Sequence, residues 1–397
     1  MIIKPRIRGF ICTTAHPSGC AAHVNEQIDY VTGQGSLVGG APVRNALVIG
    51  ASGGYGLASR IVAAFGCGAA TLGVSLEKAP SEKRTASAGW YNNFAFEEAA
   101  AAAGLYAKTL DGDAYSDEMK SRVIEILEAD MGPVDLLIYS LASPVRQHPR
   151  TGELHRSVIK PLGQALHMKS VHVDRGEVVE VDLEPADPEE TAATVAVMGG
   201  EDWEFWIDAL RDAGLLAPGF RTLAFTYIGT ELTWPIYWEG TLGKAKEDLD
   251  RAAAAISERL EDLDGSARVA VLKAVVTQAM SAIPVVPLYA SLLFKVMKER
   301  GVHEDPIQHI HRMFATQLCT DGAMRLDKSG RIRMDDLEMA ESVQEDVRNR
   351  WERVTTQNLA ELGDLDGFRE EFLKIFGFGI DGVDYDADLD PTLGRAT

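Results

Sequence analysis

Short runs of apolar residues alternate along the chain with longer segments that mix apolar and polar residues. Buried parallel strands have the first pattern, and amphipathic helices have the second. The apolar runs predict strands at residues 45–50, 70–75, 105–110, 134–140, 220–227 and 267–276. Helical periodicity predicts helices at residues 57–65, 90–103, 117–129, 188–216, 244–263, 287–300 and 306–319.

This strand–helix alternation is typical of an α/β fold, a Rossmann-type doubly wound parallel sheet with helices on both faces. Prolines and a hairpin turning at 174–176 interrupt the alternation. We interpret that stretch as an insertion over the edge of the sheet where ligands bind. One dinucleotide-binding domain, 1–397, is expected. Its additions are an N-terminal extension (1–42), a substrate-side insertion (144–186) and a C-terminal helical extension (320–397).

A glycine-rich turn follows the first predicted strand. Gly50, Gly54 and Gly56 form a G-x-x-x-G-x-G pattern that opens a predicted helix. Glycines let the backbone approach a pyrophosphate, and the helix N-terminus supplies free N–H groups and the positive end of the helix dipole. The preceding strand and the βαβ pattern downstream favour a dinucleotide site over a tight turn without a ligand.

Glu77 lies at the end of the second predicted strand, where dinucleotide sites place an acidic residue. A carboxylate there accepts a hydrogen bond from the adenosine 2′-hydroxyl and repels a 2′-phosphate, which favours NADH over NADPH. Lys78, Lys83 and Arg84 follow closely and would weaken this preference. The alternative for Glu77 is a solvated surface charge.

A tyrosine and a lysine after the fifth predicted strand are candidates for catalysis. A hydride-transferring reductase needs a hydroxyl for the charge that develops on the substrate oxygen, and an ammonium benefits the nicotinamide ribose. Tyr237 and Lys246 are nine residues apart, which places them on opposite sides of an ideal helix. Both reach one site only if Tyr237 precedes the helix, and the glycines at 240 and 243 provide that break. Lys244 lies about 200° from Lys246 on such a helix, so only one of them faces the cofactor.

With this Tyr-x8-Lys spacing, the chain resembles the FabV-type enoyl-acyl-carrier-protein reductases and the related trans-2-enoyl-CoA reductases. The resemblance runs from the N-terminus to the Asp-rich C-terminal end, and the stretches that carry it include 66–71, 89–93, 139–146, 197–203 and 283–289. It implies that NADH gives a hydride to the β-carbon of a trans-2-enoyl thioester in fatty acid synthesis. It also implies that Tyr237 donates the proton and stabilises the enolate, that Lys246 binds the nicotinamide ribose, and that Tyr227 lies against the thioester.

The resemblance further implies a set of cofactor contacts. These fall in the first glycine-rich turn and at the ends of later strands. The implied residues are Gly50, Ala51, Ser52, Gly53, Gly54, Tyr55, Leu76, Glu77, Asp113, Ala114, Leu141, Ala142, Lys246, Val275, Val276 and Thr277.

Charge and composition narrow the partners. A net charge of -20 argues against nucleic acid, whose binding depends on neutralising phosphates, and against an anionic membrane surface. No apolar run is long enough to cross a membrane, and the N-terminus does not resemble a signal peptide. We therefore expect a cytoplasmic enzyme with four reduced cysteines, and the family resemblance favours a monomer.

The expected substrate carrier, coenzyme A or acyl carrier protein, is itself anionic. Basic residues should therefore surround the entrance to the site. Two clusters are candidates, and solvated surface charges are the alternative: Arg146, His148, Arg150, Arg156 and Lys160 in the insertion, and Lys295, Lys298 and Arg300 on a later helix.

Three further interpretations fit the sequence less well. Cys12, His16 and Cys20 include three potential metal ligands, but no fourth is evident, so a packed His16 and no metal are expected. A short-chain-type ketone or alcohol oxidoreductase would share the fold, but such enzymes place lysine four residues after tyrosine. A non-catalytic NAD(H)-sensing module would have no use for the clustered Tyr227, Tyr237 and Lys246.

Overall fold

The computed structural model describes residues 1–8, 11–141 and 143–392, and within them seven strands form one parallel sheet. The strand order is β13-β12-β11-β6-β3-β4-β5, and it reverses direction between β3 and β6, where doubly wound sheets bind ligands. The prediction of a Rossmann-type doubly wound sheet is thereby confirmed. The strands are β3 (Asn45–Ile49), β4 (Ala70–Ser75), β5 (Ala107–Asp111), β6 (Val134–Tyr139), β11 (Leu216–Thr226), β12 (Ser266–Val271) and β13 (Ile332–Arg333).

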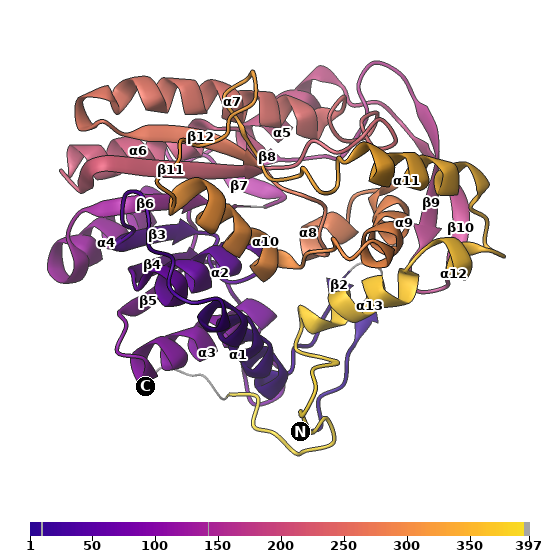
Figure 1. Ribbon diagram of the computed structural model, residues 1–397, viewed down its shortest axis with the longest axis horizontal. Coiled ribbons are helices and arrows are strands. Elements are labelled where there is room, and N and C mark those ends of the chain that lie inside the picture. The colour runs from indigo at the N-terminus through magenta and orange to yellow at the C-terminus, as the bar shows by residue number, and fades with distance from the viewer. Residues whose placement is uncertain (9–10, 142, 393–397) are drawn as a thin grey trace.

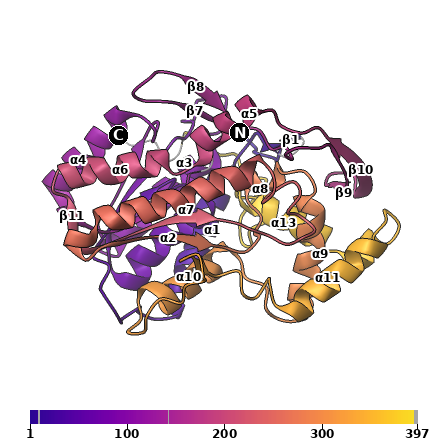
Figure 2. The ribbon, with the colours of Figure 1, turned by 90° about the horizontal axis from the view of Figure 1, so that it is seen from above.

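Helices cover both faces of the sheet because successive side chains of each buried strand point to opposite sides. Val48 and Ile138 pack on one face against α1 (Pro17–Gly33), α2 (Gly54–Ile61), α3 (Ala88–Ala102) and α10 (Pro306–Met313). Leu47 and Leu137 pack on the other face against α4 (Asp117–Ile126), α6 (Glu201–Asp212) and α7 (Thr241–Arg259). Figure 2 shows α6 and α7 lying side by side.

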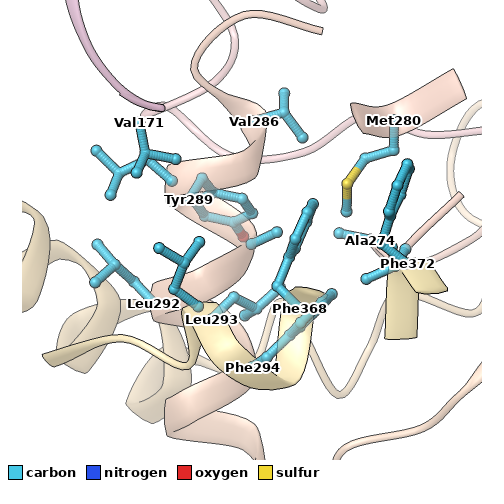
Figure 3. Close-up of a cluster of buried hydrophobic side chains, with 14 of the residues drawn as sticks. Val171, Ala274, Met280, Val286, Tyr289, Leu292, Leu293, Phe294, Phe368 and Phe372 are labelled. Atoms are coloured by element: carbon cyan, nitrogen blue, oxygen red, sulfur yellow. The ribbon is translucent and has the colours of Figure 1, made fainter. Parts of the chain in front are cut away.

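A third apolar core lies beyond the carboxyl ends of the strands. Figure 1 shows α9 (Val286–Glu299), α11 (Glu341–Arg353), α12 (Leu359–Leu362) and α13 (Leu365–Lys374) on this side of the molecule. The short helix α8 (Gln278–Ser281) and the hairpin β9 (Leu166–His172) and β10 (Glu177–Leu183) lie there too. Figure 3 shows apolar side chains of α9 packed against Phe368 and Phe372 of α13.

The N-terminal extension contains more structure than the sequence pattern indicated. A short hairpin of β1 (Ile7–Arg8) and β2 (Ile11–Cys12) is followed by the 17-residue helix α1. The helix begins at Pro17, and the ring of His16 caps it by accepting a hydrogen bond from the N–H of Gly19. This packed position of His16 agrees with its predicted structural role.

Two element predictions were wrong. The helix expected over 188–216 is two helices, α5 (Pro188–Met198) and α6, separated at Gly199 and Gly200. A Cβ at Gly200 would lie only 2.2 Å from the Cβ of Ala252, so the close approach of α7 requires glycine there. The strand expected over 267–276 ends at Val271, and the C-terminal extension adds the short strand β13, which was not predicted.

Within the described ranges, no helix has both the length and the apolar character that crossing a membrane requires.

Candidate active site

The glycine-rich turn after β3 leads directly into α2. Gly50 and Gly54 have φ values of +86° and +51°, which favour glycine, and a Cβ at Gly56 would lie 1.9 Å from the carbonyl oxygen of Gly50. No side chain caps the N-terminus of α2, where Gly53 is the N-cap residue. The turn therefore presents unobstructed backbone and free N–H groups, as the binding of a pyrophosphate requires.

Glu77 is held beside this turn, two residues after β4. Its carboxylate accepts hydrogen bonds from Ser52, at 2.5 Å, and from Ser87, and its own N–H donates to Asp111 at 2.7 Å. A Cβ at Gly89 would lie 2.0 Å from Oε1 of Glu77, so glycine at the start of α3 makes room for the carboxylate. Burial raises the pKa of Glu77, while the two serine hydroxyls oppose that rise.

The other expected cofactor residues lie along the same edge of the sheet. Leu76 is 71% exposed, whereas Ala114, Val275 and Val276 are buried. The methyl carbon of Thr277 would lie 3.5 Å from a Cβ at Gly54, which places the segment after β12 against the turn. Asp113 accepts a hydrogen bond from the N–H of Tyr115, Leu141 follows β6 closely, and Ala142 lies outside the described residues.

Tyr55 has a different role in the structure from its neighbours in the turn. Its hydroxyl donates to the carbonyl oxygen of Lys273 at 2.8 Å, just beyond the end of β12. The side chain thus ties α2 to the chain that leads to Thr277.

Tyr237 precedes α7, as the spacing required, and its side chain is 7% exposed. Its N–H donates to the carbonyl oxygen of Thr233, and its carbonyl oxygen accepts from the N–H of Gly243, both at 2.9 Å. A Cβ at Gly243 would lie 1.7 Å from the carbonyl oxygen of Trp238. Only glycine lets the turn fold back onto the start of the helix in this way.

Lys246 and Lys244 point to different surroundings on α7. Lys244 is exposed, and its ammonium pairs with Glu247 at 2.8 Å. Lys246 is half-buried, and burial lowers the pKa of its ammonium to about 8. Within the described part of the chain the ammonium of Lys246 has no carboxylate partner, so of the two lysines it is the one available to a ligand.

Tyr227, directly after β11, lies against Tyr237. The ring centroids are 5.1 Å apart and the planes meet at 82°. Burial raises the pKa of both hydroxyls, which keeps them protonated at neutral pH. The Tyr227 hydroxyl donates to Glu338 at 2.9 Å, whereas among the described residues the Tyr237 hydroxyl has no hydrogen-bond partner.

Sequence reasoning missed Glu338. It lies in the C-terminal extension among other acidic residues, such as Asp335, Asp336 and Glu341, and nothing in its local pattern distinguishes it. Only the fold brings it into contact with Tyr227 and Ala274, next to the predicted site.

The insertion closes over the start of α7. The hydroxyl of Thr241 donates to the carbonyl oxygen of Val158 at 2.6 Å. The N–H of Thr241 donates to the carbonyl oxygen of Lys160 at 3.0 Å. A mainly apolar cavity of about 500 Å³ lies between the β9–β10 hairpin, α13 and the segment before α9. Its lining includes Ile7, Val171, Val173, Ile283, Pro284 and Phe372.

Four of the eight basic residues expected at the entrance are paired with carboxylates. Arg146 is 1% exposed and pairs with Glu201 at 2.8 Å, and Lys160 pairs with Glu190 at 2.6 Å. In the second cluster, Lys298 pairs with Asp364 and Glu371, and Arg300 pairs with Asp346.

A different group of cations lines a hollow of about 320 Å³ beside β1. Within the described ranges these side chains take part in no ion pair, unlike the neighbouring Lys4, which pairs with Asp386. They are Arg6, Arg8, Lys83 and Arg84.

The structure has a dinucleotide-type turn at the switch point of a Rossmann sheet. After β11 it has a tyrosine whose pKa is raised by burial and a lysine that lacks a carboxylate partner among the described residues. Transfer of a hydride from a nicotinamide requires this combination of groups. The fold and the site thus define a nicotinamide-dependent oxidoreductase. Three family models match the chain. These are the catalytic region of trans-2-enoyl-CoA reductase over residues 84–319, its NAD(P)H binding domain over 2–82, and an enoyl reductase FAD binding domain over 326–389. The chain belongs to the trans-2-enoyl-CoA reductase family.

Individual relatives agree with this assignment. The chain is 58% identical to the NADH-dependent enoyl-acyl-carrier-protein reductase of Tolumonas auensis and 56% identical to the FabV enzyme of Aeromonas salmonicida, over 98% of each chain. The structure of Treponema denticola trans-2-enoyl-CoA reductase in complex with NAD is similar with a TM-score of 0.95, at 49% identity and 98% coverage of both chains.

The segment that matches the FAD binding model does not fit a flavin by its own residues. Its described part contains no glycine-rich turn between a strand and a helix, and its buried phenylalanines, such as Phe368 and Phe376, pack into the core around α9. We therefore derive no flavin chemistry from residues 326–389.

Proposed function

We propose that the protein reduces the trans-2 double bond of enoyl thioesters with NADH, giving saturated acyl thioesters for fatty acid synthesis. The observation that carries this proposal is Tyr237, a buried residue after β11 whose pKa burial raises and whose hydroxyl has no partner among the described residues. The names of the relatives, enoyl-acyl-carrier-protein reductase and trans-2-enoyl-CoA reductase, support the same reaction.

The residues of the site have different roles in the proposed reaction. Bound NADH would supply the hydride for the β-carbon of the substrate, and the electrons of the double bond would then move onto the thioester oxygen. The Tyr237 hydroxyl donates a hydrogen bond to this oxygen and is the source of the proton that ends on the α-carbon. Solvent returns a proton to Tyr237, so one NADH and one proton are consumed in each turnover.

The cofactor position follows from the residues of the turn and the strand ends. The backbone of residues 50–55 would hold the pyrophosphate, with Leu76, Asp113 and Ala114 near the adenosine and Leu141 near the ribose. Glu77 would accept from the adenosine 2′-hydroxyl in place of one of its serine donors, Ser52 or Ser87. Lys246 would hold the nicotinamide ribose, and residues 275–277 would contact the nicotinamide.

Tyr227 would line the substrate site through its ring. Its hydroxyl is already committed to Glu338, so the part of Tyr227 that contacts Tyr237 is the aromatic ring. The thioester would lie against this ring, and the apolar cavity beside Ile283 would accept the acyl chain.

The carrier, coenzyme A or acyl carrier protein, brings phosphate groups to the entrance. We assign their binding to the hollow of Arg6, Arg8, Lys83 and Arg84, because these cations lack carboxylate partners among the described residues of a protein whose net charge is -20. Ile7 of the same strand lines the apolar cavity, so the two hollows lie on either side of β1. We further propose that the enzyme acts in the cytoplasm as a monomer. Size-exclusion chromatography with light scattering tests the oligomeric state.

Loss of NADH absorbance with crotonyl-CoA tests the reaction. Turnover is expected for the wild type, and Tyr237→Phe should lower kcat by at least about 100-fold, because it removes the proton donor. Tyr30→Phe, on α1, is the matched control and should keep wild-type activity. A panel of ketones, measured alongside, separates this reaction from carbonyl reduction. Tight NADH binding without turnover of any enoyl thioester would overturn the proposal.

A further inference from the structure

Glu338 is a fully buried carboxylate for which the proposed reaction has no direct use. It lies in the turn after β13. Its Oε1 atom accepts hydrogen bonds from the hydroxyls of Tyr227 at 2.9 Å and Tyr289 at 2.8 Å, and its Oε2 atom accepts from the N–H of Ala274 at 2.7 Å. Gln344 of α11 completes this Glu338 cluster by donating to the Tyr289 hydroxyl and to the carbonyl oxygen of Glu338.

Burial raises the pKa of Glu338, while the N–H of Ala274, Lys273 and the two tyrosine hydroxyls oppose that rise. With Glu338 ionised, the cluster has one consistent arrangement of donors and acceptors. A buried carboxylate is costly unless donors satisfy it. The N–H of Ala274 can only donate, so Oε2 must accept. Burial raises the pKa of Tyr227 and Tyr289 above that of an ordinary tyrosine, so both hydroxyls keep the protons that they donate to Oε1.

Two of the residues that donate to Glu338 lie at the candidate active site. Tyr227 touches Tyr237 edge to face, and Ala274 directly precedes the segment 275–277 that we assign to the nicotinamide. The third donor, Tyr289, lies in the apolar core. Figure 3 shows Tyr289 surrounded by apolar side chains, among them Val286 and Leu293 of its own helix.

The hydroxyl of Tyr237 has no protein partner among the described residues to orient it. Main-chain hydrogen bonds with Thr233 and Gly243 hold the backbone of Tyr237, and the ring of Tyr227 packs edge to face against its ring. The orientation of Tyr227 therefore bears on that of the proton donor, and Glu338 fixes the orientation of Tyr227.

We propose that Glu338 is a positioning residue for the proposed enoyl reduction and that it acts through Tyr227. Its hydrogen bond holds the Tyr227 ring in place, and that ring keeps the Tyr237 hydroxyl aimed at the substrate oxygen. This inference rests on the proposed function. It adds a residue of the C-terminal extension to the machinery of the site.

Glu338→Gln is the direct test, because glutamine keeps the shape but replaces an acceptor oxygen by an amide donor. With crotonyl-CoA, kcat should fall about tenfold, a part of the contribution typical of a positioned proton donor. The dissociation constant of NADH should stay within about twofold, because the phosphate turn and Lys246 are untouched. Thermal unfolding of the same sample reports whether the variant is folded.

Two further variants separate positioning from support of the fold. Tyr289→Phe removes the other hydroxyl from the same oxygen, and it should lower the melting temperature while leaving kcat within about twofold. Tyr227→Phe should lower kcat as Glu338→Gln does, and the double variant should lose little more than either single one, since both disturb the same contact.

Some outcomes would overturn the inference. One is a Glu338→Gln enzyme that loses stability but keeps its kcat, and another is independent, multiplicative losses in the double variant with Tyr227→Phe. If Glu338→Gln does not fold, the two tyrosine variants decide, and equal losses of kcat in both would refute a path through Tyr227. Wild-type turnover in the same series shows whether the proposed function itself holds.

Discussion

The rings of Tyr227 and Tyr237 meet edge to face, with centroids 5.1 Å apart, but their hydroxyls have different surroundings. That of Tyr227 is bonded to Glu338, and that of Tyr237 is bonded to nothing in the described part of the protein. The two tyrosines of this loop thus have different roles. The hydroxyl of Tyr227 holds its own ring in place, and the hydroxyl of Tyr237 is available to a ligand.

The ammonium of Lys246 should make NADH binding dependent on pH. Its pKa of about 8 means that the cofactor-free enzyme loses this charge as the pH rises through 8. The dissociation constant of NADH, measured by fluorescence titration, should therefore increase up to about tenfold per pH unit above that value. Lys246→Met should bind NADH more weakly and without this pH dependence, whereas Lys244→Met should behave as the wild type. A pH-dependent Lys246→Met variant would contradict the assignment.

The same lysine should lower the stability of the fold at neutral pH. Its pKa is lowered by burial from 10.5 to about 8, so between these values the unfolded chain binds more protons than the folded one. The free energy of unfolding contributed by Lys246 is then least favourable below pH 8 and recovers as the pH rises towards 10.5. Lys246→Met should raise the melting temperature at pH 7 but not at pH 10.5. An equal shift at both values would exclude this cause.

Glu77 should decide the choice between NADH and NADPH. Glu77→Ser removes the carboxylate that repels a 2′-phosphate, and we expect the ratio of kcat/KM for NADPH to that for NADH to rise at least about tenfold. Gly89→Ala should weaken NADH binding by a different route, because its Cβ would lie 2.0 Å from Oε1 of Glu77 and must displace the carboxylate. Gly33→Ala is the control, since nothing lies within 4 Å of a Cβ there. An unchanged ratio in Glu77→Ser would remove Glu77 from the cofactor site.

Local patterns in the sequence indicate part of the candidate site. A stretch of a few residues is enough to indicate the glycine turn, Glu77, and the order of Tyr237, the glycine break and Lys246. The opposed directions of Lys244 and Lys246 follow from helical geometry. Glu338 could not be found in this way, because its significance arises from contacts with residues 227, 274 and 289, brought together only by the fold.

The errors in the fold have similar causes. Glycine at position 200 of the break is required by the close approach of α7, a tertiary contact that periodicity within 188–216 does not contain. The helix α1 was missed because its cap is His16 rather than one of the usual Ser, Thr, Asp or Asn residues. Arg146 was expected at an entrance but lies buried against Glu201, since charge clusters in a sequence do not show which charges are paired.

The cations beside β1 should bind the phosphates of the carrier. In Arg6→Glu/Arg8→Glu, KM for crotonyl-CoA should rise about tenfold or more, while KM for crotonyl-pantetheine, which lacks the phosphates, stays within about twofold. The difference should shrink at high salt, because exposed charges are screened. Lys328→Glu has the same charge change per residue on an exposed lysine elsewhere and serves as the control. Equal effects on both substrates would show that these arginines do not contact phosphate.

The buried pair of Lys120 and Asp202 should support both the fold and the cofactor site. The two groups are 2.8 Å apart and 4% and 2% exposed, and Lys120 also donates to the carbonyl oxygens of Ala114 and Tyr115. Lys120→Met leaves the carboxylate with Tyr139 as its remaining hydrogen-bond donor and should lower the free energy of unfolding by about 3–5 kcal/mol.

Chemical denaturation measures that loss, and the double variant Lys120→Met/Asp202→Leu should recover much of it, because no charge is then buried alone. NADH binding separates the two effects. Since Lys120 holds the turn at residues 113–115, both variants should bind NADH more weakly, even where the double variant has regained its stability. A double variant with wild-type NADH affinity would show that this turn needs no support from Lys120.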